Sequence, residues 1–221
     1  MGSRLFWLSF GGALLITSLS AWVSWEFFIK PMDAAVRTSN LLHEKFQGSL
    51  GVSPRILANA GVLFSQKSEL ESLVLSSGEV SVRETFEGQK PGGGDFSAGA
   101  GFRAEGGIFF REPFQINVRR GGAVAEVLLP QVKILRLELS TPLLFQPEDL
   151  LWDAMTERLQ TRITKGLERR AKREVLDGGL LKRAEQDLRE KVREIVSQAR
   201  CEVVFVDSEG THSVSDGDRV K

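Results

Sequence analysis

An uncharged apolar segment near the amino terminus, LFWLSFGGALLITSLSAWVSW, constrains this chain more than any other feature. It runs from Leu5 to Trp25 without an acidic or basic side chain. As an α-helix rising about 1.5 Å per residue it would be about 31 Å long, which matches the hydrocarbon thickness of a bilayer. Trp7 lies near one end and Trp22 near the other, where the two bilayer interfaces would be. The sequence therefore predicts a transmembrane helix that contacts the lipid bilayer through residues 5–29.

A cleaved signal peptide is the first alternative for this segment. The tripeptide SLS before Ala21 resembles a cleavage site, but the apolar core of a signal peptide has only about 7 to 15 residues. Here the apolar character continues through AWVSW and resumes after Glu26 with FFI. A soluble core helix is the second alternative. We favour a retained anchor over both, with residues 1–30 forming the transmembrane anchor and its short cytoplasmic start.

The basic residues around the segment do not agree on its orientation. Arg4 and the terminal amine favour a cytoplasmic amino end, whereas Lys30, Arg37 and Lys45 follow the segment, and the positive-inside rule counts basic residues on each side. A short basic start before an apolar run is typical of an uncleaved signal-anchor. We therefore expect a single-pass membrane protein whose folded part is extracytoplasmic.

Charge and cysteine content exclude several classes of function. The 29 basic and 29 acidic residues balance, so the chain has no net field to attract nucleic acid, and we expect no nucleic-acid partner. The single Cys201 excludes an intramolecular disulfide. Because it begins the run CEVVFV, we expect it to be a small apolar residue of a strand.

No catalytic, metal or nucleotide motif occurs in the sequence. His43 and His212 have no metal-ligand partner at helical or loop spacing, and neither G-x-S-x-G nor H-E-x-x-H is present. The acidic stretch 207–218 lacks the residue order of a calcium loop, and the glycine-dense stretch 88–107 contains no phosphate-binding motif. We therefore predict no catalytic, cofactor-binding or metal-binding residues, no cofactor, and a protein that is not an enzyme.

Local patterns predict an α+β fold in which an antiparallel β-rich domain, residues 55–145, follows the anchor. A juxtamembrane helix over 31–47 and a Gly/Ser/Pro linker over 48–54 precede this domain. Its glycine-dense loop, 88–107, is predicted to be a mobile hairpin connection. Runs rich in β-branched and aromatic residues predict strands. They cover residues 56–65, 73–86, 114–118, 123–129, 132–139 and, after the helices, 201–207.

Two long amphipathic helices follow the β-rich domain. Apolar residues recur in the first helix at spacings of three and four, at Trp152, Met155, Leu159, Ile163 and Leu167. A second apolar stripe runs from Leu181 to Ala199, and Gly178-Gly179 separates the two.

Both stripes must be covered, because exposed apolar rows of this length aggregate. We predict a helical hairpin in which each stripe covers the other, so that residues 146–207 form a helical arm and a strand that returns to the sheet. A continuous arm that binds a protein partner, or a second copy, through residues 147–200 is the alternative. The tail 208–221 is expected to be disordered.

The segment LERRAKR, residues 167–173, is the one concentrated basic patch of the sequence. Such a patch binds anionic lipid headgroups or a phosphorylated partner in some proteins. Glu157, Glu168 and Glu174 share the same helix, and a mixed face of this kind is usually a solvated ion-pair surface. We favour the solvated interpretation for this segment.

Four stretches of the chain resemble a bacterial family known as domain of unknown function 4230. They are ELESLVLSSGEVSVRETFEG (69–88), FRAEGGIFF (102–110), VLLPQVKILRLEL (127–139) and EVLDGGLLKRAEQDLREKV (174–192). The resemblance implies a bacterial protein with one amino-terminal membrane helix, and it brings no known reaction.

These features predict a single-pass protein of the bacterial cell envelope that acts as a non-enzymatic binding or scaffold protein. One alternative is a lipid-associated oligomeric scaffold whose layout resembles that of the stomatin-type membrane organisers. The other is an envelope hydrolase that uses Asp or Glu carboxylates.

Overall fold

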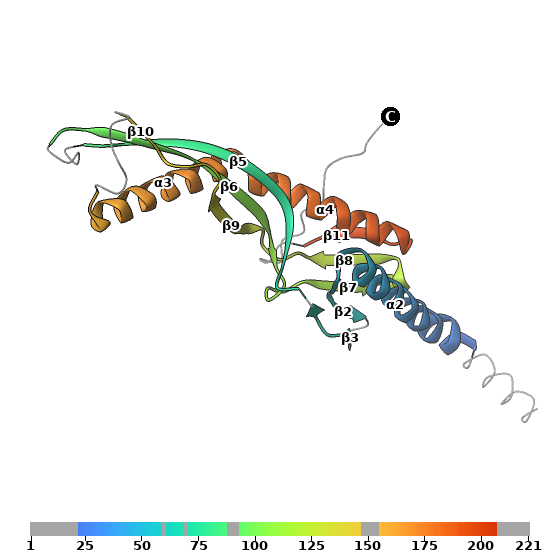
Figure 1. Cartoon of the computed structure of the whole chain (residues 1–221). Helices are drawn as coiled ribbons and strands as arrows, with labels where there is room; N and C mark the ends of the chain where they lie inside the picture. The colour runs from blue at the N-terminus through green and yellow to red at the C-terminus, as the bar shows by residue number, and fades with distance from the viewer. Residues whose placement is uncertain (1–21, 59–60, 69, 88–92, 147–154, 207–221) are drawn as a thin grey trace, which may run out of the picture. The chain divides into compact units, whose positions relative to one another are not determined.

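The computed structural model describes residues 22–58, 61–68, 70–87, 93–146 and 155–206 (Figure 1). These residues form α-helices and mainly antiparallel strands, so the predicted α+β class is confirmed. Within the described ranges, no helix is long and apolar enough to cross a membrane. Most of the predicted anchor and the whole of the predicted tail lie outside the described residues.

The chain divides into two compact units, each assembled from separate segments. Unit 1 comprises Met1–Glu69, Pro113–Leu129 and Val192–Lys221, and unit 2 comprises Leu70–Glu112 and Pro130–Lys191. This division differs from the predicted ranges 55–145 and 146–207. The physical reason is that in each unit a helix from one part of the chain covers a sheet built from another part.

Unit 1 contains a five-stranded sheet in the order β11-β8-β7-β2-β3. The strands are β2 (Arg55–Ala58), β3 (Gly61–Phe64), β7 (Gln115–Arg119), β8 (Val124–Leu128) and β11 (Glu202–Phe205). Four of the predicted strand runs are therefore confirmed in this sheet, and the run over 56–65 forms the two antiparallel strands β2 and β3. Two further short strands, β1 (Val52–Ser53) and β4 (Lys67–Ser68), pair with each other.

Helix α2 (Lys30–Leu50) packs its buried side against the sheet of unit 1. It includes the predicted juxtamembrane helix 31–47 and extends three residues into the predicted linker. The buried side chains of α2 are Ala35, Ser39, Leu42, Phe46 and Leu50. The Phe46 ring meets the ring of Phe114 edge-on, with 5.5 Å between their centroids. The helix ends at Gly51, whose positive φ of 65° is the left-handed conformation that favours glycine at this position.

Unit 2 is built around the long antiparallel pair β5 (Ser72–Phe86) and β6 (Phe96–Phe109). Strands β9 (Lys133–Leu139) and β10 (Leu144–Gln146) pair one after the other with β6. Helix α3 (Glu157–Asp177) lies along this ribbon of strands (Figure 1). The predicted strands over 73–86 and 132–139 are confirmed, whereas β6 and β10 were not predicted.

The glycine-dense stretch 88–107 is not a mobile loop over its whole length, so this prediction was wrong for its second half. Residues from Phe96 onward form β6, and residues 88–92 lie outside the described ranges. The glycines of β6 permit close contacts. A Cβ atom on Gly107 would lie only 2.0 Å from the carbonyl oxygen of Leu73, and one on Gly101 would lie 2.8 Å from Thr141 Oγ1.

The predicted helical hairpin is also wrong. The helices α3 and α4 (Leu180–Gln198) are separate, and Gly178 forms the carboxyl cap of α3, as the sequence indicated. However, Met155, Ile163 and Leu167 pack in one core cluster with strand residues of β5 and β6. The apolar stripe of α3 is therefore covered by the sheet of unit 2 and does not need α4 as its partner.

Candidate anion-binding face of helix α3

Packing against the sheet fixes which side of α3 faces solvent. The helix begins after Thr156, whose side-chain oxygen accepts a hydrogen bond from the backbone N–H of Leu159 at 3.4 Å. Gly166 lets the helix approach β5 closely, because a Cβ atom there would lie 3.3 Å from the Phe86 ring and 2.9 Å from Glu84 Oε2. The buried stripe continues to Val175. The opposite side of the helix is therefore held outward over its full length.

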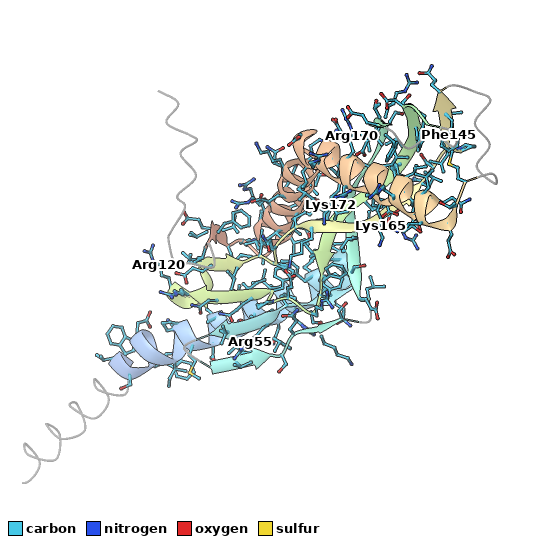
Figure 2. All side chains as sticks on the ribbon, turned by 90° about the vertical axis from the view of Figure 1, so that its left-hand side faces the viewer. Arg55, Arg120, Phe145, Lys165, Arg170 and Lys172 are labelled. Atoms are coloured by element: carbon cyan, nitrogen blue, oxygen red, sulfur yellow. The ribbon has the colours of Figure 1, made fainter. Side chains whose placement is uncertain are left out.

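Four exposed cationic residues form the centre of this outward side. Their spacings of four, three and four bring Arg158, Arg162, Lys165 and Arg169 onto one side of an α-helix. Figure 2 labels Lys165 on this helix. We call these four residues the basic face. At about 1.5 Å per residue it extends for about 16 Å along the helix. Lys172 and Arg173 continue it toward the carboxyl end.

The acidic residues of α3 leave most of this face unpaired. An ion pair within this helix joins Arg170 to Glu174, at 4.0 Å, and neither residue belongs to the basic face. Arg169 donates from Nε to the backbone oxygen of Lys165 at 3.2 Å. Within the described ranges, Arg158, Arg162 and Lys165 form no ion pair. The ion-pair surface was predicted for residues 167–173, where Arg170 pairs with Glu174, whereas most of the basic face lies before that segment.

An open hollow of about 480 Å³ lies along the basic face. Among the residues that the structure describes, its lining comprises the four cations with Thr161 and Glu168. Guanidinium groups bind phosphate and carboxylate oxygens through two parallel hydrogen bonds, and a hydroxyl adds one more donor. This combination suits an anionic ligand that carries several oxygen atoms.

A second hollow, of about 290 Å³, lies in unit 1 and has a different charge balance. It is lined by Arg119, Arg120, Val124, Glu126, Glu202 and Val204. Arg119 Nε is 2.8 Å from Glu126 Oε2, and Asn117 Nδ2 donates to the same oxygen at 3.3 Å. Because these carboxylates compensate the arginines, the hollow is a weaker candidate for binding an anion than the basic face.

The two histidines considered in the sequence do not belong to a metal site in the described parts of the chain. His43 lies on α2, where its ring stacks on Phe64 with 4.1 Å between centroids, and its buried Nδ1 has no hydrogen-bond partner among the described residues. Among the residues that the structure describes, no group of three His, Cys, Asp or Glu side chains could hold a metal ion. His212 and the acidic stretch 207–218 lie outside the described residues.

Cys201 is a buried thiol immediately before β11. Its Sγ donates to the backbone oxygen of Gly122 at 3.0 Å. Burial raises the pKa of the Cys201 thiol, because the charged thiolate loses its hydration. A protonated, hydrogen-bonded thiol is a packing group, as predicted, but Cys201 lies one residue before the strand and not in it.

Three residues of the basic face, Arg158, Arg162 and Lys165, lie before the patch 167–173 that stood out in the sequence. The patch 167–173 is a short segment with many basic residues, and the side chains of such a segment point to all sides of a helix. The spacing of four, three and four identifies cations that share one side of the helix. That periodicity was available in the sequence.

Comparison of this chain with protein-family models, with curated proteins and with solved structures finds no match. The resemblance to domain of unknown function 4230 therefore stays a prediction.

Proposed function

We propose that this chain is a single-pass membrane protein of the bacterial cell envelope that acts as a non-enzymatic binding or scaffold protein. One observation carries the proposal, a row of exposed apolar side chains where the described helix begins. Trp22 and Met32 are 59% and 57% exposed, and Trp25 and Ile29 between them are also exposed. Two indoles in such a row are typical of residues at a bilayer interface, and the apolar segment predicted to be the anchor lies directly before them.

The same helix connects this apolar row to the folded unit. Residues 22–50 are helical throughout, with a π-helical stretch at Trp25–Ile29. Lys30 Nζ pairs with Glu26 Oε2 at 2.7 Å, so charged groups flank the apolar row. From Ala35 onward, the helix has a side buried in unit 1. A membrane anchor that continued this helix would hold unit 1 close to the bilayer, which supports a binding or scaffold role there.

The basic face supports binding rather than catalysis. The hollow along it is lined by the four cations, the Thr161 hydroxyl and one carboxylate, Glu168, so positive charge predominates and the donors can hold an anion by charge and hydrogen bonds. Acyl or glycosyl hydrolysis would instead require a nucleophile beside a base, or two facing carboxylates. The basic face is therefore the surface through which we propose that the protein binds its partner.

Membrane fractionation tests the proposed anchor. Full-length chain should sediment with membranes, resist alkaline carbonate extraction and retain Met1. Replacing Leu14 and Leu15 by arginine should release the chain, because each charge at the centre of a membrane helix costs about 2.5–3.5 kcal/mol. Replacing the same two residues by isoleucine is the matched control and should change nothing. A soluble mature protein that begins at Ala21 would contradict the proposal.

A lipid-associated oligomeric scaffold is a second candidate, favoured by the edge strand β3. Val62 and Leu63 are exposed on this outer strand of the unit 1 sheet. An apolar edge strand presents unpaired backbone groups with which another chain can form a sheet. The full chain in detergent should then sediment as an oligomer, and replacing both residues by lysine should give the monomer. A monomeric wild-type chain would exclude this candidate.

A further inference from the structure

We infer that the basic face of α3 binds the phosphate groups of anionic phospholipids. The inference rests on the proposed function, since a membrane anchor would keep lipid headgroups at high local concentration around the folded units. It adds the chemistry of the partner, which the proposed function leaves open.

The positive charge of α3 is local. The whole chain carries 29 basic and 29 acidic residues, whereas α3 carries seven basic and four acidic residues. Neighbouring cations of the basic face are about 5–6 Å apart at their Cβ atoms, which is within one screening length at physiological salt, so the fields of neighbours add. Each Lys or Arg near an anionic bilayer contributes about 1 kcal/mol, which is about a fivefold increase in binding.

The shape of the face favours a headgroup layer over a compact anion. The cations form a straight row on the outward side of one helix, and neighbouring side chains are about 5–6 Å apart at their Cβ atoms. Several separate phosphates can therefore be bound at once. A small anion would engage only the two or three residues nearest to it.

An apolar side chain on the same side of α3 favours lipid over a soluble polyanion. Leu176 follows Arg169 by seven residues, which places it on the outward side, and it is 45% exposed. Amphipathic helices at membranes combine cations that contact phosphates with apolar side chains that reach the acyl chains. A soluble acidic protein or nucleic acid would gain nothing comparable from Leu176.

The test places a fluorescent reporter on the basic face of the full chain. Thr161→Cys in a Cys201→Ala background is labelled with an environment-sensitive fluorophore and reconstituted into phosphatidylcholine vesicles. A parallel sample contains about 30% phosphatidylglycerol, an anionic lipid. We expect a blue shift and stronger emission only with phosphatidylglycerol. The response should disappear at about 0.5 M salt, because salt screens exposed charges.

Matched charge removals identify the residues that bind. Arg162→Gln with Lys165→Gln removes two cations from the basic face and should weaken phosphatidylglycerol binding about 25-fold, at about fivefold per residue. Lys182→Gln with Lys191→Gln removes two exposed cations from α4 and should leave the response unchanged. Circular dichroism checks that both variants are folded.

Each contrary result has a distinct meaning. An unchanged emission with phosphatidylglycerol, in protein that resists carbonate extraction, would overturn this inference and leave the proposed anchor intact. Release of the protein by carbonate would instead overturn the proposed function. An equal response in pure phosphatidylcholine would contradict binding to phosphate charge. A response to soluble RNA or polyglutamate, but not to anionic vesicles, would assign the basic face to a soluble polyanion and overturn the lipid assignment.

Discussion

Replacing Gly107 by alanine tests the close approach of β5 and β6 that defines unit 2. The added Cβ would lie 2.0 Å from the Leu73 carbonyl oxygen and 2.7 Å from Leu135 Cδ1, whereas an ordinary contact is at least 3.4 Å. The carbonyl would have to retreat by about 1.4 Å, and an N–H···O bond does not survive stretching by that amount. The pairing is already irregular next to this position, between Val74 and Ser76.

The cost of this substitution follows from two terms. Losing about two ladder hydrogen bonds costs about 1 kcal/mol each, and overpacking a well-filled site costs about 1–3 kcal/mol. Burial of the added methyl group returns about 0.8 kcal/mol. We therefore expect Gly107→Ala to lower the free energy of unfolding by about 3 kcal/mol.

The same substitution at Gly48 is the control, and it should raise the free energy of unfolding where Gly107→Ala lowers it. Gly48 lies in α2, and a Cβ there would meet nothing within 4 Å. Alanine is favoured over glycine in a helix by about 1 kcal/mol, so Gly48→Ala should be stabilising.

Urea unfolding of the full chain in a nonionic detergent, followed by far-ultraviolet circular dichroism, measures both variants. With a denaturant slope of about 2 kcal/mol/M, the midpoint should fall by about 1.5 M for Gly107→Ala and rise by about 0.5 M for Gly48→Ala. A Gly107→Ala midpoint equal to that of the wild type would refute the close approach at Leu73. Close contact with β5 would then not explain why β6 has a glycine at position 107.

Three further predictions concern single residues. Leu188→Asp should destabilise the chain by on the order of 3 kcal/mol in the same urea assay. Leu188 is fully buried on α4, so an aspartate there would place an unpaired polar group in the core. An unshifted midpoint would contradict the burial of Leu188. Thr156→Ala should cost about 1 kcal/mol by removing the amino-terminal cap of α3, with Thr156→Ser as a control that keeps the oxygen. Because burial raises the pKa of Cys201 above its usual 9.0, its contribution to stability is present at neutral pH and is lost as the pH rises through the folded-state pKa. Wild type should therefore lose stability more steeply than Cys201→Ala above about pH 9, and parallel pH profiles would exclude the shift.

The strands that the sequence predicted are those whose burial depends on β-branched and aromatic side chains. Val80 and Val82 of β5 and Ile116 and Val118 of β7 alternate with polar residues, and this alternation can be recognised without tertiary information. Strand β6 could not be recognised in this way, because its interior is rich in glycine and alanine, residues that have little intrinsic preference for strands. Its conformation depends on pairing with β5, which precedes it directly, and with β9, which follows later in the sequence.

The helices illustrate a similar limit. The apolar stripe through Ile163 and Leu167 predicts that α3 has a partner, but it does not identify that partner. A sheet and a second helix can cover the same stripe, and the glycines between α3 and α4 permit both arrangements. A glycine at position 166 indicates a close neighbour on that side of the helix. In the structure, the neighbours are Glu84 and Phe86 of β5. The spacing of the basic face, in contrast, can be recognised in the sequence. Only the packing of α3 against the sheet shows that this side of the helix faces solvent.

The parallel pairing of β11 with β8, from Glu202 opposite Val124 to Phe205 opposite Val127, has a consequence for biogenesis. During synthesis, β2, β7 and β8 emerge from the ribosome long before β11, so the β8 side of the sheet stays an open edge for the intervening residues. Unit 2 contains no segment after Lys191 and can therefore fold while unit 1 is still waiting for its last strand. A nascent chain stalled in this interval would present an unpaired β-edge to its neighbours, which is a substrate for chaperones and proteases. Release of Phe205 from the ribosome would thus be the event that makes unit 1 resistant to degradation.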